Sequence, residues 1–215
     1  MARHFICVIL SVALSGGTLL GGAAYARSGG PGESFTPIAE ASPALAPFQH
    51  VRFCLRYPSE CKSNPAESDR IDLNTQNSQL LRRINHEVNA EISPMIKTPG
   101  PELEAGWTIS PAAGDCNDYA VTKRHELLGQ GLPAAALRLS VVKTSSGIGH
   151  LVLVVATTSG DMVLDNLTEA VIPWQETDYR WLKIQSASDA RFWYDVKAKN
   201  MTASRAARRI DVANR

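Results

Sequence analysis

The hydrophobic periodicity of the chain changes near residue 136, and this change constrains the fold most strongly. Before it, apolar residues recur every three or four positions over residues 73–92, and Pro94 ends the pattern. A second helix is expected to begin at about Cys116 and to run to about Leu128, where Gly129, Gly131 and Pro133 end it. The spacing in the first segment and the stop signals after both predict two helices in the first part of the chain.

After residue 136 the pattern is that of β-strands. Apolar and β-branched residues dominate three segments, 136–142, 150–157 and 161–166, and turns rich in Ser, Thr and Gly separate them. Shorter strands are expected near Ala170 and over residues 181–184. Helices followed by an antiparallel sheet predict an α+β fold in a single domain, which fits a chain of 215 residues.

The ends of the chain have compositions of their own. Residues 1–26 combine Arg3, an apolar stretch and the motif Ala24-Tyr25-Ala26, as in a secretory signal peptide that is cleaved off. Residues 27–47 are rich in Gly and Pro and are expected to form a flexible arm. Residues 201–215 are expected to be a basic tail. The domain is then expected over residues 48–200, in the periplasm or outside the cell.

The charge of the expected mature chain excludes one class of partner. Arg3 is the only Lys, Arg, Asp or Glu among residues 1–26, so 21 of the 22 basic residues remain against 21 acidic residues. Proteins that bind nucleic acids or anionic membranes need clustered positive charge. We therefore expect no nucleic-acid partner, and no stable membrane insertion once the signal peptide is removed.

Three cysteines remain in the expected mature chain, in a compartment where disulfides persist. Cys54 and Cys61 enclose a Tyr57-Pro58 step that favours a turn, so a disulfide between them is expected. A zinc site that uses His50, Cys54 and Cys61 is the alternative, although no fourth ligand has a standard spacing. Cys116 is left as an unpaired thiol.

Cys116 stands at the expected beginning of a helix, where free backbone N–H groups and the helix dipole stabilise negative charge. A thiolate at such a position is a good nucleophile, and the neighbouring amides are able to hold an oxyanion. The alternative is a buried structural cysteine next to a capping Asp115, since free cysteines are commonly buried. The residues around Cys116 do not by themselves separate these interpretations.

A nucleophilic cysteine needs a base, and the four histidines of the expected mature chain differ in position. His125 lies nine residues along the same helix and therefore points away from Cys116. His86, on the polar side of the earlier helix, and His50, beside the cysteines, are interpreted as surface histidines. His150 begins an apolar strand after a glycine-rich turn, where an imidazole is able to meet a helix N-terminus.

Asp165 is the candidate for the group that orients this imidazole. It ends an apolar stretch on the strand expected to pair with the strand of His150. If a four-residue turn pairs Ala156 with Asp161, then Asp165 and His150 share one face of the sheet. A shift of this register by one residue separates the two side chains.

These motifs resemble those of the bacterial transglutaminase-like cysteine proteinases, which have a transglutaminase-like (papain-like) fold. The resemblance covers about residues 48–195. It rests on Trp107, then Gly114-Asp115-Cys116-Asn117-Asp118-Tyr119-Ala120 with Lys123, then Gly149-His150 and Val163-Leu164-Asp165-Asn166. It implies that Cys116, His150 and Asp165 form a catalytic triad.

Some members of this family are periplasmic, calcium-dependent endopeptidases that release large surface adhesins. The resemblance therefore implies a protein or peptide substrate, with a surface adhesin as one candidate, and calcium ligands at Asp115 and Asp118. Asn117 stands where a Glu is usual in the family, which weakens the expectation of calcium dependence, because calcium affinity follows ligand charge. The chemistry itself requires no cofactor.

The leading expectation is an exported cysteine peptidase that hydrolyses peptide bonds through this triad and a thioester intermediate. Trp107 is a candidate wall of the substrate cleft, and its alternative role is that of a core or loop-anchoring indole. Two other functions stay open: transfer of the same acyl group to a lysine amine, and a non-catalytic binding protein that keeps the fold.

Overall fold

The computed structural model describes residues 36–64, 66–95 and 106–197. Its helices are α1 (Phe48–Arg56), α2 (Thr75–Glu91) and α3 (Cys116–Gly129), with short 3-10 turns η1 (Pro58–Cys61), η2 (Ala134–Ala136) and η3 (Trp174–Glu176). Its strands are β1 (Glu40–Ala44), β2 (Ser93–Pro94), β3 (Ala113–Gly114), β4 (Leu137–Lys143), β5 (Gly149–Thr157), β6 (Gly160–Leu164), β7 (Ile172–Pro173), β8 (Arg180–Gln185) and β9 (Trp193–Val196).

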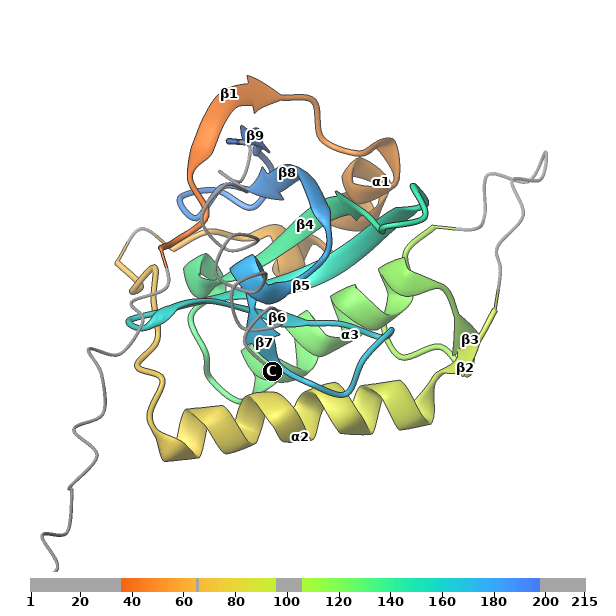
Figure 1. The fold of residues 1–215 in the computed structure, drawn as a ribbon. Coiled ribbons are helices and arrows are strands. Elements are labelled where there is room, and N and C mark those ends of the chain that lie inside the picture. Colours follow the sequence, from red (N-terminus) through yellow and green to blue (C-terminus); the bar gives the residue numbers. More distant parts are fainter. Residues whose placement is uncertain (1–35, 65, 96–105, 198–215) are drawn as a thin grey trace, which may run out of the picture. The chain divides into compact units, whose positions relative to one another are not determined.

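Seven of the strands form one sheet in the order β1-β9-β8-β4-β5-β6-β7 (Figure 1). Each neighbouring pair in this sheet is antiparallel. β2 and β3 pair separately, as a two-residue parallel ladder. The expected α+β fold, in which helices precede an antiparallel sheet, is confirmed.

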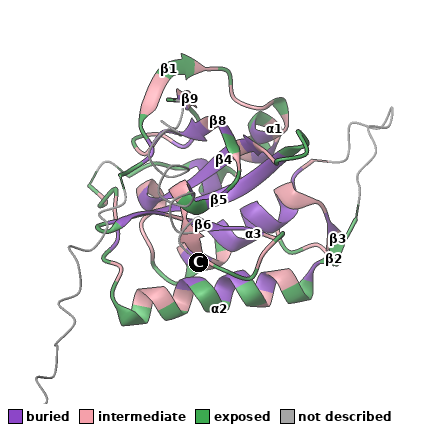
Figure 2. Ribbon diagram, in the orientation of Figure 1, coloured by how far each residue is buried: buried purple, intermediate pink, exposed green. Residues whose placement is uncertain are grey.

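Helix α3 is the central helix of the described fold. It packs against β5 on one side and against α2 on the other, and Figure 2 shows α3 as buried along much of its length while α2 keeps an exposed side. α2 buries a stripe of Leu81, Ile84, Asn85 and Val88, which is the spacing of an amphipathic helix. None of the described helices is both long and apolar enough to span a membrane.

The strand register that the sequence predicts is present. Ala156 pairs with Asp161, and Leu153 pairs with Leu164. β6 ends at Leu164, so Asp165 is the first residue after the strand rather than part of it. This register carries Asp165 toward the beginning of β5, where His150 lies.

The expectation of a flexible arm over residues 27–47 is wrong for the last part of that segment. Strand β1 pairs with β9 at the edge of the sheet, and the N–H of Ile38 donates a hydrogen bond of 2.8 Å to Asp161. An edge strand is ordered by the backbone of its neighbour, so its own sequence needs little periodicity. The rest of the expected arm, the expected signal peptide and the basic tail lie outside the described residues.

Candidate active site

Cys116 is the first residue of α3 and is half-buried. A capping box encloses it: Asp115 accepts the N–H of Asn117 at 3.0 Å, and Asp118 accepts the N–H of Asp115 at 2.9 Å. A Cβ atom at Gly114 would lie 2.5 Å from the Asp118 carboxylate, so only glycine leaves room for this box. The cap fixes the residue at which the helix begins. It therefore also fixes the position of Cys116 and of the first free backbone N–H groups of the helix.

His150 and Asp165 are joined by a hydrogen bond of 2.7 Å between Nε2 and Oδ1. The same oxygen accepts the N–H of Leu167 at 3.0 Å, and the Tyr179 hydroxyl donates to Oδ2. The Tyr179 ring also stands edge-on to the imidazole, with 5.7 Å between the ring centroids. Both oxygens of this buried carboxylate are thus engaged, and the imidazole is held on two sides.

The electrostatics of the site link Cys116 to this pair. Burial lowers the pKa of His150, but hydrogen bonds with Asp165 and Cys116, together with the charges of both, raise it to about 9. Burial raises the pKa of Asp165, and the bonds from His150, Tyr179 and Leu167 outweigh it and lower that pKa. Because Nε2 of His150 bonds to Asp165, Nδ1 is the nitrogen left for the sulfur. The arrangement favours an imidazolium at His150, placed between the sulfur of Cys116 and the Asp165 carboxylate.

Helix α2 supplies two amides that hold the loop following β6. Asn85 accepts the N–H of Asp165 at 3.1 Å and donates to the carbonyls of Thr168 and Glu169. Asn89 donates to the Asp165 carbonyl at 3.1 Å and to the Glu169 carboxylate at 3.2 Å. The backbone on either side of the Asp165 side chain is therefore tied to α2.

The sequence interpretation missed Tyr179, Asn85 and Asn89. Asn85 carried a usable signal, because it interrupts the buried stripe of α2 between Ile84 and Val88 and a polar residue in an apolar stripe needs a partner. Tyr179 carried none, since it lies between η3 and β8, outside any helix or strand.

The remaining histidines lie away from Cys116, but one of them differs from its expected environment. His86 is exposed and contacts Glu169, and His125 contacts Glu60 at 2.7 Å, as their positions on the helices predict. The interpretation of His50 as a surface residue is wrong, because it is 1% exposed.

His50 is buried in a neutral form by partners that are distant in the sequence. Its Nδ1 accepts the Trp193 indole N–H at 3.2 Å, and its Nε2 lies 2.9 Å from the amide nitrogen of Gln185. Burial, and then the charge of Arg124, lower the pKa of His50 to about 4. More than 130 residues separate it from both partners, so no local pattern predicts this environment.

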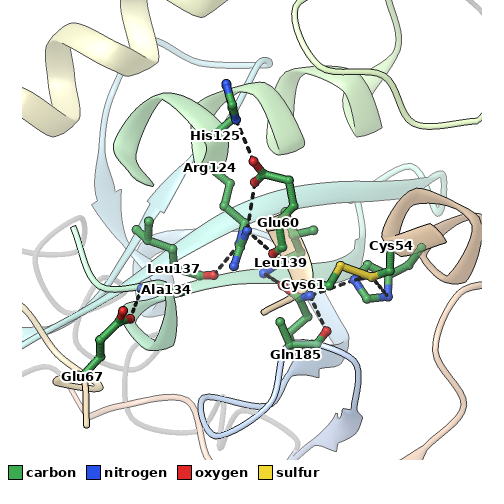
Figure 3. Close-up of polar contacts among 12 residues, drawn as sticks. Cys54, Glu60, Cys61, Glu67, Arg124, His125, Ala134, Leu137, Leu139 and Gln185 are labelled. Atoms are coloured by element: carbon green, nitrogen blue, oxygen red, sulfur yellow. Dashed lines mark hydrogen bonds and ion pairs between the residues drawn. A yellow bond between two sulfur atoms is a disulfide. The ribbon is translucent and has the colours of Figure 1, made fainter. Parts of the chain in front are cut away.

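The expected disulfide between Cys54 and Cys61 is present, with an S–S distance of 1.98 Å and 5.5 Å between the Cα atoms (Figure 3). Ligand atoms of His50, Cys54 and Cys61 all lie within 4.8 Å of one another. Because both sulfurs are engaged in the disulfide, neither is a thiolate that binds zinc. The zinc alternative therefore does not describe this structure.

A buried ion pair joins the disulfide segment to α3 (Figure 3). Arg124 donates to the Glu60 carbonyl at 2.7 Å, to its carboxylate at 3.2 Å and to the Leu137 carbonyl at 3.0 Å. The other oxygen of the Glu60 carboxylate contacts His125. Arg124 and Glu60 are 2% and 6% exposed, so this buried cluster ties α3 to η1 and to the first residue of β4.

Trp107 lies in the hydrophobic core rather than on an open wall. It is 4% exposed, and its ring centroid lies 5.6 Å from that of His50 and 6.1 Å from that of Phe53. This position matches the alternative interpretation, an indole that anchors its loop to α1.

The donors at the beginning of α3 do not fit a calcium ion. Asp118 is fully buried, and its oxygens accept the backbone N–H groups of Thr108 and Asp115 at 2.8 and 2.9 Å. Asp115 accepts both the backbone and the side-chain N–H of Asn117 at 3.0 Å. Calcium requires about six to eight oxygen ligands, and in the part of the chain that the structure describes these two carboxylates work as helix caps.

A surface cavity of about 370 Å³ adjoins the site. Asp165 and Tyr179 line it, together with Thr144 and Ser145 of the turn that precedes His150. Apolar side chains such as Val163 and Ile172 form another part of its lining. A cavity with an apolar lining beside a few polar groups is typical of ligand pockets.

Comparisons with known proteins identify the family. The chain is similar to Legionella pneumophila LapG in its calcium-bound form, at 18% identity and a TM-score of 0.46 over 62% of this chain and 80% of that chain. A second structure of that protein is similar at 19% identity and a TM-score of 0.45, over 61% of this chain and 75% of that chain. Its EGTA-treated form is similar at 20% identity and a TM-score of 0.43, over 61% of this chain and 76% of that chain. No curated protein matches. The sequence model of the bacterial transglutaminase-like cysteine proteinases (BTLCP) matches residues 40–201. The chain therefore belongs to the bacterial transglutaminase-like cysteine proteinase family and is a cysteine peptidase.

Proposed function

We propose that the protein is an exported peptidase that hydrolyses peptide bonds with Cys116 as nucleophile, His150 as acid and base, and Asp165 as the orienting group. The observation that carries this proposal is the bond of 2.7 Å between His150 and Asp165 on an imidazole that also bonds to Cys116. Cys116 is the free cysteine of the described chain. Family membership, over residues 40–201, supports the reaction class.

In the first half of the reaction, the Cys116 sulfur attacks the carbonyl carbon of the substrate. The C–N bond then breaks, and His150 gives its proton to the leaving amine. The oxygen of the tetrahedral intermediate carries the negative charge. The N–H of Cys116, as the first residue of a helix, has no acceptor within the helix and is a suitable donor to that oxygen.

In the second half, water cleaves the thioester. Neutral His150 takes a proton from the water, the hydroxyl group bonds to the carbonyl carbon, and the C–S bond breaks to give a free carboxylic acid and Cys116. Asp165 holds the imidazole in the tautomer that both halves need, because it accepts the Nε2 proton. Tyr179 and Leu167 stabilise the carboxylate while the imidazole is neutral.

The substrate in this proposal is a protein or peptide, with a surface adhesin as the candidate that the family resemblance implies. The cavity beside Asp165 and Tyr179 is the proposed place for one of its side chains. Export to the periplasm or the exterior completes the proposal, and the disulfide between Cys54 and Cys61 is typical of proteins in such compartments.

The test is a comparison of new protein N-termini. Exported proteins of the organism that produces this protein are incubated with the purified wild-type chain or with Cys116→Ala. The N-terminal amines of all resulting polypeptides are then identified by mass spectrometry. We expect one or a few new N-termini that depend on Cys116. Isopeptide bonds to lysine in place of new N-termini would support amide transfer, and identical profiles for the two proteins would refute catalysis by Cys116.

Calcium removal is expected to have little effect on the reaction. Since Asp118 is buried and engaged with two backbone N–H groups, EGTA should change kcat/KM of the wild type by less than about twofold. The matched variant is Asn117→Glu, which adds a carboxylate at the first turn of α3 and is expected to bind calcium more tightly. Complete loss of wild-type activity in EGTA, with recovery on adding calcium, would contradict the capping role of these residues.

A further inference from the structure

Lys123 is a buried cation behind the candidate active site. It lies on α3 seven residues after Cys116, which is close to two helical turns, so both side chains leave the helix on the same side. The residue is 1% exposed, and within the described residues its ammonium group has no hydrogen-bond partner. A buried amine without a partner is unfavourable for stability, and a methionine of similar length would fill the same space.

The charges that face Lys123 come from the loop after β6. Asp165 and Glu169 both stabilise its ammonium form, and Lys123 in turn acts on Glu169. α2 contributes the neutral amides Asn85 and Asn89, and the side-chain oxygen of Asn89 is buried without a partner. From α3 itself, the Tyr119 ring lies 6.0 Å from the ammonium nitrogen.

Two more titratable groups contact those carboxylates. His150 bonds to Asp165, and His86 bonds to Glu169 on the exposed side. During the proposed reaction His150 becomes neutral when it protonates the leaving amine, and the buried Asp165 carboxylate then loses the positive charge beside it. The Asp165 charge interacts with Lys123, so Lys123 is a buried cation that is able to compensate this carboxylate at that stage.

We propose that Lys123 is a positioning residue of the peptidase reaction: its ammonium group compensates the charges of Asp165 and Glu169, and so keeps the loop that carries Asp165 in the orientation that His150 needs. This inference rests on the proposed role of Asp165. It explains why α3 retains a buried amine although an apolar side chain would stabilise the fold more. Residues that are kept against stability are typical of functional sites.

The charge of Lys123 is expected to change near neutral pH, which makes its role measurable. Burial lowers the pKa of Lys123 to about 7, although Asp165 and Glu169 oppose this effect. The charged form is present below that pH and is lost above it. Lys123→Met should therefore reduce kcat/KM by about 10- to 100-fold at pH 6, as expected when a catalytic group is slightly misplaced. The difference from the wild type should shrink as the pH rises through about 7 toward 9.

Thermal stability supplies a second measurement, in which Lys123→Met is expected to raise Tm although it lowers kcat/KM. The unfolded chain holds the lysine proton up to a higher pH than the folded chain, so wild-type stability gains with pH between about 7 and the ordinary lysine value of 10.5. Lys123→Met should melt several degrees higher than the wild type at pH 6, and by a smaller margin at pH 9. His150 is present in both proteins, so its own titration cancels in this comparison.

The experiment measures kcat/KM on the cleaved peptide and Tm from pH 6 to 9 for the wild type, Lys123→Met and Lys123→Leu, with the exposed Lys62→Met as the matched control. We expect both Lys123 variants to be more stable and less active than the wild type, and the difference in kcat/KM to depend on pH. Lys62→Met should have the kcat/KM and Tm of the wild type. Wild-type kcat/KM in the Lys123 variants, or a gap that is the same at every pH, would overturn the proposal.

A measurement without substrate separates this proposal from the proposed function. NMR titration of the lysine side chains in the wild type and in Asp165→Asn should show that the Lys123 pKa falls when the Asp165 charge is removed. An unchanged Lys123 titration would refute the coupling even if Cys116 is catalytic. A wild-type chain without cleavage activity would instead refute the proposed function, whether or not this coupling is found.

Discussion

Replacing Asp165 with Asn is expected to lower kcat/KM by about 10³- to 10⁴-fold while leaving the chain folded. An asparagine amide has the shape of the carboxylate but not its charge, and it is able to turn its NH₂ group toward Nε2. The imidazole then takes the wrong tautomer. Its charged form also loses the negative charge of the carboxylate, whose oxygen lies 2.7 Å from Nε2 in the wild type. The loss should appear in kcat/KM of the cleaved peptide, with a far-ultraviolet circular dichroism spectrum like that of the wild type.

The control for this substitution is Asp189→Asn. Asp189 pairs with Arg191 in the segment between β8 and β9. The control therefore makes the same change of Asp to Asn at a position outside the proposed triad. We expect wild-type activity from this control. If Asp165→Asn also keeps more than about a tenth of wild-type kcat/KM, Asp165 does not orient the base, because the corresponding loss in a working triad is far larger.

Arg124→Met is expected to cost about 3–5 kcal/mol of unfolding free energy. The substitution keeps most of the apolar stem but removes the cation from a pair that is 2% and 6% exposed. It leaves the Glu60 carboxylate buried, and it removes the donor to the carbonyls of Glu60 and Leu137. Urea unfolding followed by circular dichroism measures the change.

The exposed pair of Arg83 and Glu87 on α2 provides the comparison. Its N–O distance is 3.2 Å, equal to that of the buried pair, but its side chains are 50% and 45% exposed. Arg83→Met should therefore change the unfolding free energy by less than about 0.5 kcal/mol. Equal losses in the two variants would show that burial does not set the strength of the Arg124 cluster.

The parts of the fold that depend on local pattern were predictable from the sequence. Helix α2 follows from apolar spacing and from Pro94, α3 follows from the stop residues after it, and the register of β5 and β6 follows from the short turn between Thr157 and Gly160. That register alone was enough to predict that Asp165 and His150 share a face. The disulfide was predictable because the Tyr57-Pro58 step ends α1 and lets η1 turn back.

The parts that depend on distant partners were not predictable. β1 is ordered by pairing with β9, which lies about 150 residues later, and His50 is buried by Gln185 and Trp193. Lys123 belongs to the family motif, but its role depends on the loop after β6 lying against α2 and α3. Such environments arise from tertiary packing, which overrides local propensity.

The most direct test of the proposed reaction is to trap the acyl group on Cys116. The wild-type chain and its substrate peptide are mixed and quenched in acid within one turnover, and the intact mass is measured before tandem mass spectrometry locates the adduct. We predict a thioester that joins the N-terminal half of the substrate to Cys116, absent from Cys116→Ala. Cleavage without any adduct on Cys116, together with equal cleavage by Cys116→Ala, would contradict the proposed mechanism.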